Sequence, residues 1–157
     1  MKASYLETIS LVERLHRQCL EVVKFELDRM GVRDLNNVQA LILFNIGDEE
    51  LTVGELTQRG YYLGSNVSYN VKKMVENGYL IQERSLHDRR SFHVHASESG
   101  LKIFRALGQL FDQHAENGLQ NAQLSDDVLK NANETLQRVL QFWSVPSQYG
   151  NRMNPAA

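Results

Sequence analysis

Cysteine and long apolar runs are scarce in this sequence of 157 residues. The single cysteine, Cys19, excludes an internal disulfide framework and supplies no cysteine cluster for zinc. No apolar run reaches the roughly 18 residues that span a bilayer. The N-terminus passes directly into an amphipathic pattern and has no apolar signal segment. We therefore expect a cytoplasmic protein with no membrane partner.

Charge of one sign is also lacking overall, since the formal net charge is only −2. Hydrophobic residues make up 42% and charged residues 23%, which is typical of a single globular domain and not of a disordered chain. The charges are unevenly distributed, because residues 58–96 carry six Lys/Arg against three Asp/Glu. A DNA duplex responds to the local potential, so this one positive segment is the candidate for nucleic-acid contact.

The spacing of apolar residues predicts a long helix over 5–30 that ends at Gly31 and a buried helix over 35–46. The first helix has an apolar stripe so wide that it needs more than one packing surface. Thr52 and Glu55 have the spacing of a capping box, which predicts a short helix over 53–59.

A further helix is expected over 65–77, capped by Ser65 or Asn66 and ended by Asn77-Gly78. Strand-like segments at 79–85 and 91–96 flank a polar tip and predict a β-hairpin. Helices over 98–117 and 126–143 follow, the last capped by Ser125. This order predicts a mainly α fold with a small β-hairpin wing (α+β), which is a winged helix-turn-helix flanked by long helices.

The helix at 65–77 turns short polar side chains and two lysines away from its apolar stripe. Amide and hydroxyl groups suit base edges in a major groove, and lysines suit phosphates. A merely solvated face is the alternative for this helix taken alone. The hairpin tip favours the DNA interpretation, since Arg89 and Arg90 could enter a minor groove while Asp88 orients one guanidinium. The candidate DNA-binding residues are Ser65, Asn66, Ser68, Tyr69, Asn70, Lys72, Lys73, Arg84, Arg89 and Arg90.

The segment from Asp88 to Gly100 resembles the wing signature of MarR-family regulators, D-x-R-x-x-x-V-x-L-T-x-x-G. Asp88, Arg90, Val94 and Gly100 match, and Ala96-Ser97 replace the usual leucine and threonine. Thr52-x-x-Glu55-Leu56 and the stretches at 65–68 and 76–81 are similar to the family's helix-turn-helix. The run at 60–66 also resembles a branch associated with cell-wall L,D-transpeptidase genes, which implies cell-wall or stress-related targets.

The resemblance implies a homodimer that binds double-stranded DNA at a pseudo-palindromic operator, usually as a repressor. It implies one MarR-like chain over 1–157, with a winged helix-turn-helix at 35–97, dimerisation helices at 1–34 and 98–146, and a flexible tail at 147–157. It also implies that a small molecule, aromatic or phenolic, lowers DNA affinity by binding between the two regions. Apolar residues near that junction suggest a pocket lined by Phe44, Tyr61, Tyr62, Leu63 and Phe111.

Other chemistry has little support in the sequence. Cys19 lies on an apolar stripe, which favours a buried structural cysteine over a redox switch. His93 and His95 share one face of a strand but have no third zinc ligand nearby, so polar packing or phosphate contact is favoured. No catalytic constellation or cofactor motif is found, and we expect no enzyme, no cofactor and no metal. The alternatives are a winged-helix module that binds protein and a regulator switched through Cys19.

Overall fold

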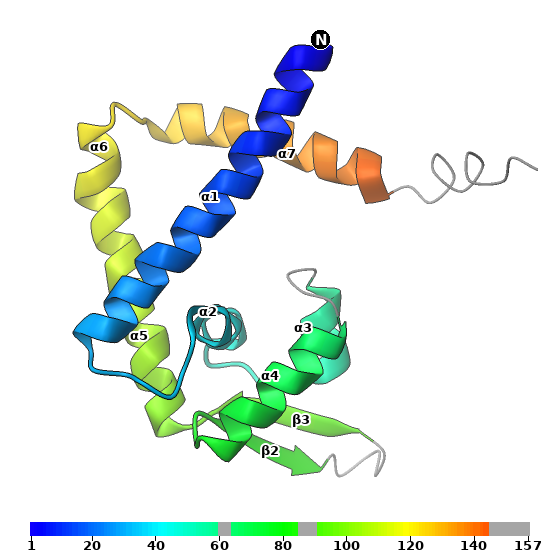
Figure 1. The fold of residues 1–157 in the computed structure, drawn as a ribbon, viewed down its shortest axis with the longest axis vertical. Helices are drawn as coiled ribbons and strands as arrows, with labels where there is room; N and C mark the ends of the chain where they lie inside the picture. The colour runs from blue at the N-terminus through cyan, green and yellow to red at the C-terminus, as the bar shows by residue number, and fades with distance from the viewer. Residues whose placement is uncertain (60–63, 85–90, 145–157) are drawn as a thin grey trace, which may run out of the picture. The chain divides into compact units, whose positions relative to one another are not determined.

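The computed structural model describes residues 1–59, 64–84 and 91–144 (Figure 1). The chain divides into two compact units, residues 1–110 and 111–157. The first unit contains α1 (Lys2–Arg29), α2 (Asn37–Ile46), α3 (Val53–Gln58), α4 (Gly64–Glu76) and most of α5 (Glu98–Gln113). It also holds the three strands β1 (Leu51–Thr52), β2 (Leu80–Arg84) and β3 (Phe92–Ala96). The predicted mainly α fold with a small β wing is confirmed.

The long helix α1 is buried only near its C-terminal end, at Val23, Glu26 and Leu27. There it packs on α2 (Figure 1). The buried Glu26 carboxylate accepts two hydrogen bonds from Arg29, at 2.6 and 2.9 Å, and this pairing lowers the pKa of Glu26. The remaining apolar stripe is exposed in the single chain, at Tyr5, Leu6, Leu11, Val12, Leu15, Val22 and Phe25.

Two capping boxes fix where α2 and α3 begin. Asn36 accepts a hydrogen bond from the Gln39 amide, and the Gln39 side chain accepts one from the Asn36 amide. Because Asn36 is the cap, α2 begins two residues later than the sequence predicts. Thr52 and Glu55 form the predicted box, with distances of 3.1 Å and 2.7 Å for the two reciprocal bonds.

The sheet has three antiparallel strands in the order β1-β3-β2. Residues 80–84 pair with 96–92, so the predicted hairpin is confirmed. A third strand, which the sequence did not indicate, joins the hairpin, because Leu51 and Thr52 pair with Val94 and His93. A strand of two residues is too short to show an alternating pattern, and Thr52 also serves as the cap of α3.

The core of the first unit lies between α2, α4, β3 and α5. Its fully buried side chains include Ile42, Leu43, Met74, Val94 and Leu107. Helix α4 packs against β2 and α3, and α2 contacts β3 (Figure 1). One side of α4 therefore packs against the core, and its other side faces the solvent.

The helix predicted over 98–117 is regular only to Gln113, after which His114–Gly118 form a turn of π-helix. In the second unit α6 (Leu119–Asn121) and α7 (Asp126–Ser144) follow. The Ser125 hydroxyl accepts a hydrogen bond from the Val128 amide at 3.3 Å, which confirms the predicted cap. Exposed apolar residues of α7 are Val128, Leu136, Leu140, Phe142 and Trp143. Among the described helices, none combines the length and apolarity that a membrane crossing needs.

Candidate nucleic-acid interface

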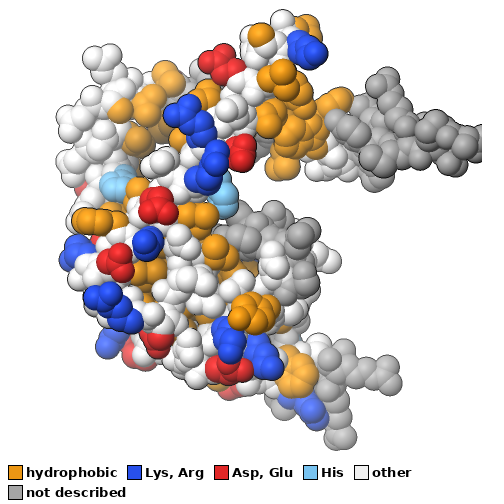
Figure 2. All heavy atoms as spheres, viewed as in Figure 1, with side chains coloured by type: hydrophobic (Ala, Val, Ile, Leu, Met, Phe, Trp, Pro, Cys, Tyr) orange, Lys and Arg blue, Asp and Glu red, His pale blue; other side chains and the backbone are white. Residues whose placement is uncertain are grey.

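The outward face of α4 is set by three buried side chains. Val67, Val71 and Met74 are at most 3% exposed and hold one side of the helix against the core. The opposite side carries Ser68, Tyr69 and Lys72, all exposed, with Tyr69 at 62%. These residues follow an i, i+1, i+4 spacing and therefore share one face. Figure 2 shows Lys/Arg side chains beside a hydrophobic one over this helix, an arrangement that suits phosphate and base contact.

Two other predicted residues of α4 already have partners within the helix. The Asn70 amide nitrogen donates to the Asn66 carbonyl oxygen at 2.8 Å. Lys73 forms an ion pair with Glu76 at 2.9 Å, which raises the pKa of Lys73 and lowers that of Glu76. Lys72 has no such ion pair with any described residue. Of the two adjacent lysines, Lys72 is therefore the one that would reach a phosphate without first breaking an ion pair with a described residue.

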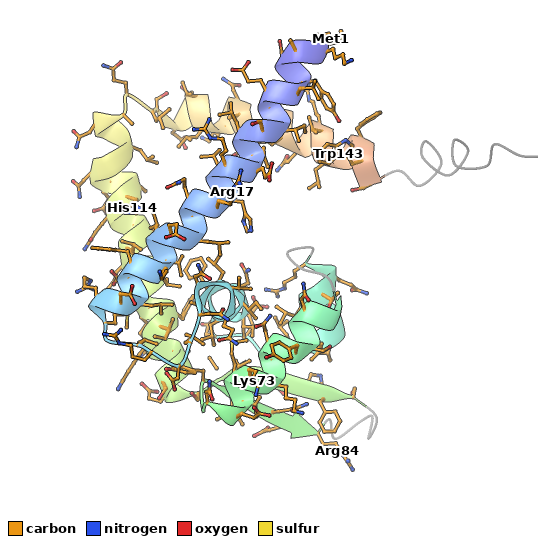
Figure 3. The ribbon with its side chains drawn as sticks, viewed as in Figure 1. Met1, Arg17, Lys73, Arg84, His114 and Trp143 are labelled. Atoms are coloured by element: carbon orange, nitrogen blue, oxygen red, sulfur yellow. The ribbon has the colours of Figure 1, made fainter. Side chains whose placement is uncertain are left out.

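The base of the wing is described, and its tip is not. Arg84, at the end of β2, lies over the Phe92 ring, with 5.5 Å from its guanidinium carbon to the ring centre (Figure 3). The two residues are directly paired across the strands. Asp88, Arg89 and Arg90 lie outside the described residues, as does the side chain of Ser65. Their DNA contacts remain predictions.

His93 and His95 project from β3 toward carboxylates. His93 Nδ1 lies 4.0 Å from Glu50, and His95 Nε2 lies 3.8 Å from Glu83. Within the described ranges, no group of three or more His, Cys, Asp or Glu side chains could hold a metal ion. These contacts fit polar packing on the sheet face, and phosphate contact by either histidine stays a prediction.

A hydrogen-bonded clamp joins the end of α4 to the loop between α1 and α2. The Tyr79 hydroxyl donates to an Asp34 carboxylate oxygen at 2.6 Å, and the Asn77 side chain donates to the Asp34 carbonyl at 2.7 Å. Burial and the Asp34 carboxylate raise the pKa of Tyr79 to about 12. Sequence analysis missed this clamp because residues 43 and 45 positions apart follow no local pattern.

Replacing Tyr79 with phenylalanine should lower the free energy of unfolding at neutral pH by about 1–2 kcal/mol, because Asp34 loses its donor. The raised pKa means that this contribution is complete below pH 10, the ordinary tyrosine value, and is lost as pH rises toward about 12. Urea denaturation across that alkaline range should show a steeper decline for the native chain than for Tyr79→Phe. Tyr69→Phe, at an exposed tyrosine, is the control. Identical alkaline profiles for native and Tyr79→Phe would contradict the clamp.

Comparison with known proteins identifies the family. Residues 33–91 match the family model described as MarR family. The chain is also 34% identical over 147 residues to the Exopolysaccharide II synthesis transcriptional activator ExpG of Rhizobium meliloti, covering 94% of this chain and 75% of that protein. The chain belongs to the MarR family. It is therefore a transcriptional regulator with a winged-helix fold.

Solved structures agree with the MarR-family fold. Streptococcus pneumoniae FabT in complex with DNA matches with a TM-score of 0.71 and 18% identity, over 88% of this chain and 96% of FabT. The S. aureus MepR–DNA complex matches with a TM-score of 0.68 and 18% identity, over 85% of this chain and 96% of the MepR chain. At these identities the likeness concerns the fold alone.

Of the five residues predicted to line an effector pocket, only Phe44 and Phe111 are described, one in each unit. Phe44 packs against Phe104, with ring centres 5.7 Å apart, and Phe111 lies edge-on to His114 at 6.4 Å. Tyr61, Tyr62 and Leu63 lie outside the described residues. The aromatic pocket stays a prediction. Cys19 is a free, half-buried thiol. Both interpretations of this residue, a structural cysteine and a redox switch, stay predictions.

Proposed function

We propose that this MarR-family regulator binds double-stranded DNA as a homodimer, with one α4 in each of two successive major grooves. The observation that carries the proposal is the exposed Ser68, Tyr69 and Lys72 face on a helix whose other side is fully buried. Helices of this kind read base edges, and half-sites in dimers lie about one helical turn apart. The wing residues Arg84, Arg89 and Arg90, with Asp88 orienting one guanidinium, would contact the flanking backbone or minor groove.

The exposed apolar faces of α1 and α7 support the dimer. Each of these helices carries several exposed large apolar side chains, and exposed apolar patches mark association sites. The regions 1–34 and 98–146, which the family resemblance implies are dimerisation helices, would supply the surface that a second copy covers. A regulator acting on DNA in this way would work in the cytoplasm.

The direction of regulation has two candidates. The family resemblance implies repression relieved by a small effector. The relative at 34% identity is named a transcriptional activator, which favours activation for this chain. A promoter–reporter fusion measured with and without the regulator separates the two, since deletion raises expression under repression and lowers it under activation.

A fluorescence titration at several salt concentrations should show tighter binding to a pseudo-palindromic promoter site than to a random duplex of equal length. Specific sites in such systems typically bind about 10³-fold or more tightly than random DNA. The logarithm of the binding constant should fall linearly with the logarithm of the salt concentration, because each phosphate contact displaces counterions from the DNA. Equal affinity for both duplexes would refute specific recognition. Absence of salt-sensitive binding to either duplex would favour the alternative of a protein-interaction module.

A further inference from the structure

Tyr69 lies at the centre of the outward face of α4. Because an α-helix has 3.6 residues per turn, this position is almost directly opposite the three buried side chains of the helix. Asn66 and Lys72, three residues before and after Tyr69, are exposed and lie on either side of it. A groove that receives this face of α4 would therefore meet the tyrosine ring first.

The ring of Tyr69 differs in chemistry from its surroundings. Among the exposed residues that the structure describes in α4, Tyr69 carries the only large apolar group, and 62% of the residue is exposed. The major-groove edges of the base pairs offer one apolar group, the C5 methyl of thymine, and apolar side chains such as phenylalanine contact it. An aromatic ring at the centre of the helix face therefore matches a thymine.

The other side chains of α4 offer less to a G·C pair. A bidentate arginine or lysine is the usual contact of guanine, and a carboxylate accepts a hydrogen bond from cytosine. Helix α4 contains no arginine, and its one carboxylate, Glu76, is paired with Lys73 at 2.9 Å. Lys72 is left as a cation, and a lysine suits a phosphate as well as a guanine. The apolar contact of Tyr69 is thus the more specific signal of this helix.

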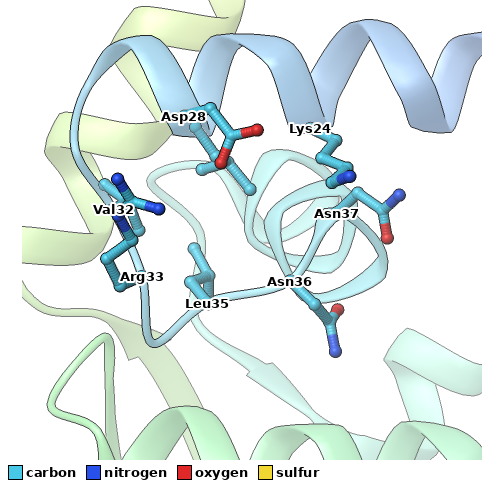
Figure 4. Close-up of a pocket in the computed structure, with 8 residues that line it drawn as sticks. Lys24, Asp28, Val32, Arg33, Leu35, Asn36 and Asn37 are labelled. Atoms are coloured by element: carbon cyan, nitrogen blue, oxygen red, sulfur yellow. The ribbon is translucent and has the colours of Figure 1, made fainter.

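Helix α4 is also held firmly enough to place a side chain. Its end is tied to the loop between α1 and α2, which Figure 4 shows with Arg33 and Leu35 labelled. Asp34 of this loop accepts hydrogen bonds from Asn77 and Tyr79, at 2.7 and 2.6 Å. A contact made from a helix that is already fixed loses less conformational entropy on binding, which favours a specific base contact by Tyr69.

We propose that Tyr69 contacts the C5 methyl group of a thymine in the major groove of each half-site, and that this contact makes thymine the preferred base at that position. The aromatic ring makes the contact, and the hydroxyl is not needed for it. This inference rests on the proposed function, because it requires α4 to lie in the major groove.

The test uses duplexes that the full chain selects from a random-sequence library. The selected sites should carry a thymine at one symmetric position of both half-sites. Deoxyuridine at that position keeps the base pairing and removes only the methyl group. Binding by the native chain should then weaken about fourfold for each half-site changed, as expected for one methyl group that is no longer buried. Tyr69→Phe should show the same loss, and Tyr69→Ala should bind the thymine and deoxyuridine duplexes equally.

Lys72→Ala is the matched control, because it should weaken binding to both duplexes and leave the ratio of their affinities unchanged. Equal binding of the native chain to both duplexes at every thymine tested would overturn the inference and leave the proposed function intact. An unchanged ratio in Tyr69→Ala would overturn it as well, since another side chain would then contact the methyl group. Loss of the ratio in Tyr69→Phe would assign the contact to the hydroxyl and overturn it too. A selection that enriches no sequence would refute the proposed function and this inference with it.

Discussion

Replacing Gly100 with alanine should lower the free energy of unfolding by about 2–3 kcal/mol, at the upper end of what overpacking a core costs. A β-carbon at this position would lie 2.2 Å from the Tyr79 carbonyl oxygen, 3.3 Å from the Ala96 β-carbon and 3.2 Å from a Leu43 methyl. The first contact is with a backbone atom, so α5 would have to move away from Tyr79 to relieve the clash. The glycine that matches the family signature is therefore needed for close approach.

Gly108→Ala is the matched control, because it makes the same change in the same helix where nothing lies within 4 Å of the added carbon. Alanine is the better helix former by up to about 1 kcal/mol, so this variant should be slightly more stable than the native chain. Urea denaturation of the three proteins at equal concentration measures the difference. Equal stabilities for the two variants would mean that α5 and Tyr79 are not in close contact.

The double variant Tyr69→Ala/Lys72→Ala should lose about 10²-fold or more in affinity for a specific operator. A good base-edge contact is worth about 1–3 kcal/mol, a lysine–phosphate contact adds affinity for any sequence, and both side chains lie on the exposed face of α4. Loss of Lys72 should also reduce the salt slope by about one per protomer. Competition fluorescence titrations against a random duplex measure both quantities.

Two controls separate this effect from general charge loss. Lys102→Ala removes an exposed cation from α5 and should leave operator affinity nearly unchanged. Lys73→Ala removes a lysine of α4 that is paired with Glu76, and its effect should be smaller than that of Lys72→Ala. A double variant that binds the operator as tightly as the native chain would exclude this face of α4 from recognition.

Local signals in the sequence predicted most of the winged region. The Thr52–Glu55 box and the Ser125 cap depend on residues three apart, and both are present. The Lys73–Glu76 pair has the same spacing and could have been foreseen. Because it was not, Lys72 and Lys73 were predicted as equivalent phosphate contacts.

Features that depend on distant residues were beyond local patterns. The clamp of Asp34 to Asn77 and Tyr79 spans more than 40 positions, and β1 exists only because β3 offers it a partner. The π-helical turn at His114–Gly118 likewise has no signature in the apolar periodicity that predicted one continuous helix. The wing tip predicted from Asp88, Arg89 and Arg90 lies outside the described residues.

No residue separates β1 from α3. Thr52 pairs with His93 in the sheet, and its hydroxyl caps the helix that begins at Val53. A hinge needs at least one residue whose backbone can rotate freely, and this junction has none. Helix α3 and strand β3 must then move together as one rigid body, so a change in the tilt of α3 also moves the base of the wing. A residue inserted between Thr52 and Val53 would let the two elements move independently.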